Sequence, residues 1–334
     1  MRRVEGMRKA SVLGVAAVLL VWAGVSRVEA QAEYRFVRIV GGTPEGSWGI
    51  TGSKLAELIN RSVKGVTASN SPGATVANVV TVNEARAQLG ISSADAVHEV
   101  YYGLDKWKGK EAKNVRFLAA LHTVPAHAFV RADSPIQEFR EIATKPLRIQ
   151  GYTKGSITHR LVEHSLSIFG SSMEDLQKRA GVIQYVSDGP AVEMMRNSQL
   201  DLIFRNTGAP SSWVLEAETS MSLRFLKMDN AYLKAITARI PGLVVESIPA
   251  GTYKAMKDDY KTFSVVTVLI VPAGMPDAVA EGITASLWDN LEEFKKIGGF
   301  AKTIKFDEAL RGNTIPVHPG AARYYRSKGV KVEN

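Results

Sequence analysis

The chain has 334 residues, of which 45% are hydrophobic and 22% are charged, and its formal net charge is +9. This composition is that of an ordinary globular protein, and it excludes collagen-like, disordered and polytopic membrane chains. At about 100–200 residues per domain, the length predicts two domains. Cysteine is absent, which excludes disulfides, Cys-ligated zinc, iron–sulfur clusters and thiol catalysis.

Residues 1–30 have the order of a secretory signal peptide. Basic residues within 1–10 precede an uncharged stretch, residues 10–25, that is rich in Ala, Val and Leu, and Val28 and Ala30 supply the small or aliphatic residues that precede a cleavage site. The apolar stretch is short for a membrane span, which needs roughly 20 residues. We therefore expect cleavage after Ala30 and export to the periplasm, with a retained N-terminal anchor as the alternative.

Removal of residues 1–30 leaves 37 Lys and Arg against 31 Asp and Glu, a net charge of +6. The remaining basic residues are scattered, and their densest group, residues 106–110, is brief. A short run of this kind indicates a solvated loop rather than a nucleic-acid surface. We expect no nucleic-acid partner.

Along the rest of the chain, short β-branched or aromatic runs alternate with helical patterns. The expected strands are residues 34–40, 87–92, 116–121, 126–132, 147–150, 182–185, 200–204, 223–228, 243–247 and 263–271. The expected helices are residues 50–61, 75–83, 94–102, 157–169, 190–197, 211–219 and 276–297. The last helix is the clearest, because Val279, Ile283 and Leu287 recur at helical spacing. This alternation predicts an α/β fold with largely parallel sheets in two lobes.

Two loops rich in glycine and hydroxyl groups each lie between an expected strand and an expected helix. The first is Gly-Gly-Thr-Pro-Glu-Gly-Ser at residues 41–47, and the second is Gly-Tyr-Thr-Lys-Gly-Ser at residues 151–156. Open α/β sheets bind ligands beyond the carboxyl ends of their strands, where helix N-termini present unpaired N–H groups. One such loop in each lobe predicts a ligand cleft between the lobes.

The motifs that would indicate an enzyme are absent from the sequence. Gly41 and Gly46 have the spacing of a phosphate-binding loop, but Ser47-Trp48 stands where Lys-Ser or Lys-Thr is required. No Gly-x-Ser-x-Gly elbow is present. The six histidines have no metal-binding spacing, and His122 and His127 fall on opposite faces of an extended chain. The sequence therefore predicts no catalytic residue, no cofactor and no metal site.

Seven further motifs follow one another in a fixed order within residues 34–329. They are Gly-Gly-Thr-x-x-Gly-Ser-Trp at 41–48 with its helix at 54–60, Gly-Ala-Thr-Val-Ala-Asn at 73–78, Leu-Gly-Ile-Ser-Ser-Ala-Asp at 89–95, Gly-Ser-x-Thr at 155–158, Thr-Gly-Ala-Pro at 207–210, Ile-Pro-Ala-Gly-Thr-Tyr at 248–253, and Ile-Pro-Val-His-Pro-Gly-Ala-Ala-Arg-Tyr-Tyr at 315–325. In this order they resemble TAXI-type solute-binding proteins, which are the extracytoplasmic subunits of a class of TRAP (tripartite ATP-independent periplasmic) transporters.

The resemblance implies a two-lobed, class II-type periplasmic binding protein fold with the ligand cleft between the lobes. Its expected division is residues 31–125 and 268–334 for a discontinuous lobe I, and residues 126–267 for lobe II. The expected strands 126–132 and 263–271 would cross between the lobes. The helix 276–297 would lie along the back of the cleft.

From lobe I, the resemblance implies six ligand-binding residues: Gly42, Thr43, Trp48, Thr75, Asn78 and Ser93. The glycine lets the backbone approach a ligand, and Trp48 offers a flat wall. As alternatives, Trp48 packs its own helix, and Thr75 or a neighbour of Gly73 caps the helix that begins at 75. Ser93 stands where the family often has Gln, and Asp95 is interpreted as either a contact or a helix cap.

From lobe II, the resemblance implies six more: Gly155, Ser156, Thr158, Arg205, Thr207 and Pro210. An arginine in the cleft would bind a carboxylate through paired N–H groups, worth about 1.5–3 kcal/mol when desolvated. The alternative for Arg205 is an ion pair at the surface or between the lobes. Tyr253 and His318 are expected to stabilise the fold and the hinge.

Relatives of this type bind glutamate-like amino acids or dicarboxylates. The resemblance therefore implies a small organic anion as ligand, the membrane permease subunits of a TRAP transporter as partner, and a monomer that closes on its solute. One alternative keeps the binding fold but couples it to a sensor or chemoreceptor. Another, an exported hydrolase, has no nucleophile and base in the sequence to support it.

Overall fold

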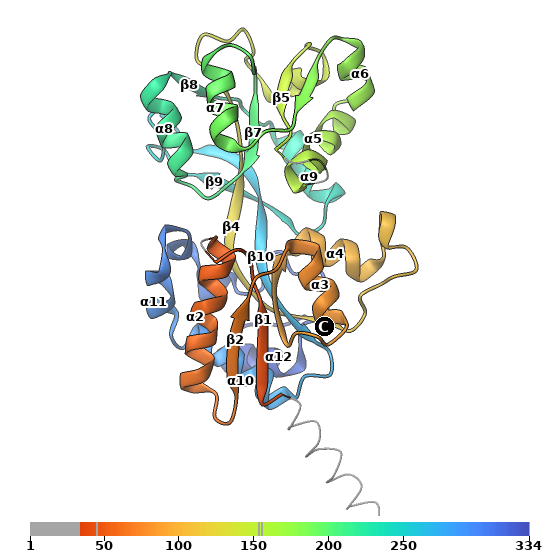
Figure 1. Ribbon diagram of the computed structural model, residues 1–334, viewed down its shortest axis with the longest axis vertical. Helices are drawn as coiled ribbons and strands as arrows, with labels where there is room; N and C mark the ends of the chain where they lie inside the picture. Colours follow the sequence, from red (N-terminus) through yellow and green to blue (C-terminus); the bar gives the residue numbers. More distant parts are fainter. Residues whose placement is uncertain (1–33, 45, 153, 155, 334) are drawn as a thin grey trace, which may run out of the picture.

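The computed structural model describes residues 34–44, 46–152, 154 and 156–333, and the expected signal peptide lies outside them. The chain forms two lobes that are stacked along the long axis of the molecule and joined by two long strands (Figure 1). Among the described residues, no helix has both the length and the apolar composition needed to cross a bilayer.

Lobe I contains a sheet in the order β2-β1-β3-β10-β4. Its strands are β1 (Phe36–Val40), β2 (Thr67–Ser71) and β3 (Leu89–Ser93), together with the first part of β4 (Val115–Arg131) and the last part of β10 (Tyr260–Pro272). β1 pairs with β2 and with β3 in parallel. The sequence did not predict β2, because its residues, Thr-Ala-Ser-Asn-Ser, are typical of a loop, and pairing with β1 at the sheet edge makes this segment a strand.

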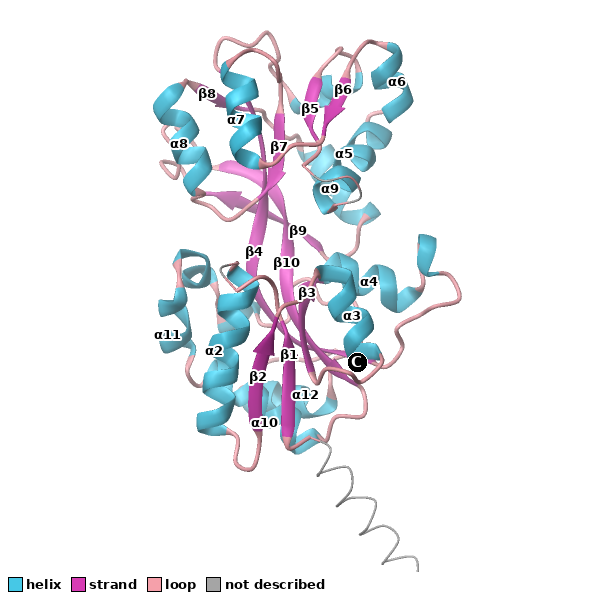
Figure 2. Ribbon diagram, in the orientation of Figure 1, coloured by secondary structure: helices cyan, strands magenta, loops and turns pink. Residues whose placement is uncertain are grey.

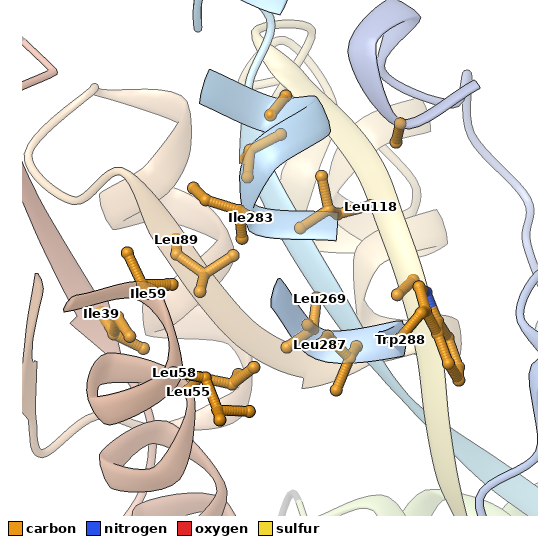
Figure 3. Packing of buried hydrophobic residues seen from close by; sticks show 14 of the residues in the cluster. Ile39, Leu55, Leu58, Ile59, Leu89, Leu118, Leu269, Ile283, Leu287 and Trp288 are labelled. Atoms are coloured by element: carbon orange, nitrogen blue, oxygen red, sulfur yellow. The ribbon is translucent and has the colours of Figure 1, made fainter. Parts of the chain in front are cut away.

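Helices cover both faces of this sheet. They are α2 (Ser47–Ser62), α3 (Thr75–Asn83), α4 (Ala94–Tyr102), α10 (Asp277–Trp288), α11 (Leu291–Phe294) and α12 (Pro319–Ser327), with short 3-10 turns η1 (Asp105–Trp107), η3 (Lys295–Ile297), η4 (Gly299–Thr303) and η5 (Phe306–Glu308). Leu55 and Leu58 of α2 and Ile283 and Leu287 of α10 belong to one buried cluster (Figure 3). α3 and α4 contribute to a second cluster with β4 and β10.

The helix expected at 276–297 is shorter in the structure, and it does not lie along the back of the cleft. α10 ends at Trp288, and Asn290 turns its side-chain amide back to donate to the carbonyl of Ser286 at 2.8 Å. Apolar residues of α10, including Ile283, are buried in the core of lobe I with residues of α2 and α12. The helix therefore packs inside lobe I and not along the cleft, because its apolar stripe is covered by that core.

Lobe II contains shorter strands and the remaining helices. The strands are β5 (Arg148–Gln150), β6 (Val182–Gln184), β7 (Ile203–Asn206), β8 (Leu223–Phe225) and β9 (Leu243–Ile248). The helices are α5 (Ile157–Ile168), α6 (Met173–Lys178), α7 (Asp188–Arg196), α8 (Ser212–Ser220), α9 (Asn230–Arg239) and the 3-10 turn η2 (Phe139–Ala143). Two buried clusters fill this lobe, one on each side of β4 and β7.

β4 and β10 are the crossing strands, and they run antiparallel to each other from lobe to lobe (Figure 2). The sequence predicted two strands at 116–121 and 126–132, but β4 is one strand of 17 residues. The segment 122–125, which contains a proline, continues the strand because Thr123, Val124 and Pro125 lie opposite residues of β10. Partners in a sheet thus override a local loss of strand propensity.

The buried clusters follow the expected division of the chain. The lobe I clusters draw their buried residues from positions up to Leu121 and from Val266 onward. The lobe II clusters draw theirs from Ala126 to Val265. This separation supports boundaries near residues 125 and 267, and the division into 31–125, 126–267 and 268–334 stays a prediction.

Tyr325 offers a test of the lobe I core. Its fully buried hydroxyl donates to the carbonyl of Leu118 at 2.8 Å and accepts from the indole N–H of Trp288 at 3.0 Å. Tyr325→Phe leaves both partners unsatisfied, so we expect the free energy of unfolding to fall by about 1–3 kcal/mol in a urea titration. Tyr102→Phe, at an exposed residue, is the control and should change little. Equal unfolding midpoints for both variants would contradict the prediction.

Candidate ligand-binding site

Strands of lobe I, including β3, end at their carboxyl ends toward lobe II, and strands of lobe II, including β7, end toward lobe I. β10 is antiparallel to β3, with Thr267 opposite Ser93, the last residue of β3. β7 is antiparallel to β4, with its last residue, Asn206, opposite Ala126. β3 therefore ends toward lobe II and β7 ends toward lobe I. Ligands of open α/β sheets bind at such edges.

Six helices begin just after strands at these facing edges: α2, α3 and α4 in lobe I, and α5, α7 and α8 in lobe II. Only α5 has an N-cap side chain that accepts a hydrogen bond, with Ser156 Oγ accepting from the N–H of His159. By contrast, α6, α9 and α12 are capped in this way by Ser172, Asp229 and His318. Helix N-termini without a capping side chain favour an anionic group.

In lobe I, the first glycine-rich loop lies against the crossing strands. The indole N–H of half-buried Trp48 donates to Thr267 Oγ1 at 3.2 Å, and that hydroxyl lies 3.3 Å from His122 Nε2. A Cβ at Gly42 would lie 3.0 Å from the Cβ of Trp48, so this loop packs closely against the start of α2. Thr43 is exposed and Thr75 is half-buried. Trp48 thus both packs its helix and lines the region between the lobes.

Asn78 has its amide occupied inside lobe I. The residue is 1% exposed, and its Nδ2 donates to the carbonyls of Gly41 and Ile91, each at 2.7 Å. Its Oδ1 accepts from the N–H of Ala74 at 3.0 Å. Asn78 therefore ties the glycine-rich loop to β3 and to the start of α3. Ser93, also buried, precedes the first residue of α4.

In lobe II, the expected residues lie in two regions, one from the end of β5 into α5 and the other from β7 into the loop that follows it. Gly155 lies outside the described residues, and Ser156 caps α5. Thr158 is fully buried. Thr207 Oγ1 lies 3.2 Å from Ser211 Oγ, and exposed Pro210 follows a cis peptide bond. Ser156, Thr207 and Pro210 are thus placed at the facing edge, whereas Thr158 is covered.

Arg205 forms an ion pair inside lobe II. Its Nε donates to Asp188 Oδ1 at 2.9 Å, and its Nη1 donates to the carbonyl of Asn206 at 2.9 Å and to Thr158 Oγ1 at 3.4 Å. The guanidinium carbon lies 3.7 Å from the ring centroid of Tyr152. The ion pair of Arg205 thus lies within lobe II and not between the lobes. The sequence did not connect Arg205 with Asp188, because the two residues come from different strand–helix units.

Another arginine, Arg160, forms ion pairs between the lobes. Arg160 of α5 donates through Nη2 to Asp95 Oδ2 at 3.1 Å and through Nη1 to Glu99 Oε2, and both acids lie on α4 of lobe I. Burial raises the pKa of Asp95, and the positive charge of Arg160 opposes that rise. Asp95 and Glu99 are four residues apart on one helix face, which the sequence shows, but their partner is not visible from spacing.

Cavities lie on both sides of the crossing strands. One of about 290 Å³ is lined from both lobes, and Thr123, Glu246, Phe300 and Arg311 are among its residues. Gly208 and Ala209 also line it, so it adjoins the loop that carries Thr207 and Pro210. A cavity of about 90 Å³ lies beside Arg160. The largest described cavity, about 730 Å³, is formed by lobe II alone and contains none of the expected ligand residues.

The two hinge histidines are buried and act as structural groups. Burial lowers the pKa of His122 and of His127 to about 4, so both are neutral near pH 7. His127 Nδ1 lies 3.0 Å from the carbonyl of Pro125, and its Nε2 lies 3.0 Å from the hydroxyl of Tyr253. Within the described part of the chain, no group of three acidic, His or Cys side chains is arranged to hold a metal ion.

Comparison with known proteins found a matching family and several solved structures with a similar fold. Residues 39–329 match the NMT1-like family. Among solved structures, XAC2383 from Xanthomonas citri, bound to chloride ion, has a TM-score of 0.51 at 10% identity, covering 88% of this chain and 95% of that one. The periplasmic aliphatic sulphonate binding protein SsuA from Escherichia coli has a TM-score of 0.47 at 14% identity, covering 87% and 78%. A TctC solute binding protein from Polaromonas has a TM-score of 0.46 at 15% identity, covering 78% and 87%.

These similarities, at low sequence identity, concern the fold alone. The similarity to XAC2383, with the two lobes and their crossing strands, confirms the predicted α/β, two-lobed fold. The family match spans most of the described chain, and this protein therefore belongs to the NMT1-like family.

Proposed function

We propose that this protein captures a small organic anion, a glutamate-like amino acid or a dicarboxylate, between its lobes and delivers it to the permease of a TAXI-type TRAP transporter. The family and the fold support a solute-binding protein of the periplasmic type. The motifs within residues 34–329 support the TAXI assignment.

One observation carries the anionic class of the ligand. At the facing edges of the two lobes, α2 and α3 of lobe I and α8 of lobe II begin without a capping bond from the N-cap side chain and without an acidic residue in the first turn. The N-terminus of a helix carries a partial positive charge and N–H groups that lack intrahelical partners. Helix starts of this kind on both lobes would hold a carboxylate between them. Closure of the lobes would then follow binding, because the groups come from both.

Solute binding is tested by calorimetry and tryptophan fluorescence on the purified protein with glutamate, 2-oxoglutarate and C4-dicarboxylates. We expect Arg205→Gln to weaken binding about 10- to 100-fold, through loss of a charged hydrogen-bond donor. Arg148→Gln is the matched control, because Arg148 also pairs with an aspartate, Asp201, but at the amino end of β5. Absence of binding to every compound, or equal affinities in wild type and Arg205→Gln, would contradict the proposal.

Delivery to a TRAP permease is tested separately, with the membrane subunits reconstituted in vesicles and the purified protein added outside. We expect uptake that requires an ion gradient and proceeds without ATP. Uptake that requires ATP would contradict the TRAP assignment and leave solute capture standing.

A further inference from the structure

Arg205 and Asp188 form a charge pair at the lobe II edge of the proposed site. Their side chains are 16% and 22% exposed, so each is largely desolvated but still reaches the surface. Arg205 lies in β7 near its carboxyl end, and Asp188 is the first residue of α7. Both positions are on the edge that faces lobe I.

Neighbouring groups fix the pair in place. Tyr152 stacks over the guanidinium, and it does so from a left-handed backbone conformation, with a φ of 60°, that a bulky residue rarely adopts. Thr158 and the carbonyl of Asn206 take the Nη1 donors. On the acid, Gln150 Nε2 donates to Asp188 Oδ1 at 3.3 Å, the same oxygen that accepts from Arg205 Nε.

In the described part of the chain, each side chain of the pair has one polar atom without a hydrogen-bond partner. Among the described residues, Arg205 Nη2 donates no hydrogen bond and Asp188 Oδ2 accepts none. The pair therefore presents a cationic donor and an anionic acceptor side by side. Its net charge is zero, so it has no net attraction for an anion.

This arrangement discriminates between two classes of ligand. A lone carboxylate that approached Arg205 would lie near the carboxylate of Asp188, and like charges at close range repel. A molecule with a carboxylate and an ammonium on the same carbon meets both edges favourably, with its carboxylate on Nη2 and its ammonium on Oδ2. With such a ligand bound, each of the four charged groups, two from the protein and two from the ligand, lies next to a group of opposite charge.

We propose that Arg205 and Asp188 together bind the zwitterionic head of an α-amino acid, with Tyr152 and Gln150 as positioning residues. This inference rests on the proposed function and narrows its ligand class to amino acids over dicarboxylates. Asp188 thereby becomes the residue that sets specificity for the ammonium group.

The test is calorimetry on the intact protein with two matched pairs of compounds, L-glutamate with glutarate and L-aspartate with succinate. In each pair the compounds differ by the α-ammonium group. We expect wild type to bind an amino acid at least about tenfold more tightly than its partner, and Asp188→Asn to remove this preference. The amide oxygen of the variant can still accept from Arg205 and Gln150, so the fold is expected to persist, which circular dichroism and the Tm check.

Asp201→Asn is the matched control, because it weakens the equivalent pair with Arg148 and should leave the preference unchanged. A dicarboxylate that binds wild type as tightly as its amino acid, or a preference that survives in a folded Asp188→Asn, overturns the inference while anion capture stands. If no compound of either pair binds wild type, the proposed function and this inference both fail.

Discussion

Arg160→Gln is expected to lower the free energy of unfolding by about 3 kcal/mol at pH 8, since it removes the cation that faces a buried carboxylate. The side chain of Asp95 is 1% exposed and that of Glu99 is 11% exposed, so both acids depend on Arg160 for compensation. Arg160 itself is 30% exposed, which places the cost at the lower end of the range for broken buried pairs.

The loss should depend on pH, with a definite sign. Burial raises the pKa of Asp95 above its usual range, so the folded state binds the proton more tightly than the unfolded state does. Stability therefore falls as pH rises from the unfolded pKa, about 3.9, through the folded one. Without Arg160 the folded pKa rises further. The deficit against wild type is then smallest at acid pH, where Asp95 is protonated in both states, and grows toward pH 8.

Urea titrations of wild type and Arg160→Gln at pH 4, 6 and 8 measure this effect. The double variant Arg160→Gln with Asp95→Asn should recover part of the loss at pH 8, because the uncompensated charge is gone. Lys178→Gln is the control, since its pair with Asp175 lies at 3.5 Å on the exposed surface and contributes little. A deficit of the same size at pH 4 and pH 8 would show that Asp95 does not cause it.

Asn78→Ala is expected to have the second large effect. It tests whether Asn78 stabilises the fold or contacts the ligand. The change leaves the carbonyls of Gly41 and Ile91 and the N–H of Ala74 without their partner, so we expect a loss of about 3 kcal/mol in the free energy of unfolding. Hydrogen exchange should quicken in residues 41–47, because the glycine-rich loop loses its tie to α3.

Asn60→Ala is the matched control for this variant. Asn60 also bridges backbone groups, donating to the carbonyl of Ala68 at 3.0 Å and accepting from its N–H at 2.6 Å, but it is exposed. Water can replace those bonds, so its loss should be smaller. If Asn78→Ala keeps the stability of wild type and loses only ligand affinity, Asn78 is a direct ligand contact and the structural assignment is wrong.

Local patterns predicted many of the helices and strands. The bounds of α3 and α4 match the expected helices 75–83 and 94–102, because apolar spacing and neighbouring strands mark them on both sides. α9 was missed although Asp229 caps it and Tyr232, Leu233 and Ile236 recur at helical spacing. α12 was missed because its Pro319-Gly320 start reads as a turn, whereas Gly320 lies so close to Asp277 that a Cβ would come within 2.2 Å of its carbonyl oxygen.

The sequence by itself determined the alternation of strands and helices, the loops at strand ends, and the absence of cysteine chemistry, because each depends on residues that are neighbours in the chain. It also placed Trp48, Ser156 and Thr207 at edges that the structure brings to face each other.

Only the tertiary structure decided which polar side chains are already occupied. Arg160 and Asp95 are 65 residues apart in sequence, and the partners of Asn78 come from three different segments. Burial and hydrogen bonding between distant segments depend on how the lobes pack, and no local spacing encodes them. For that reason Asn78 was expected at the ligand, while Arg160 and Asp188 were identified only from the folded chain.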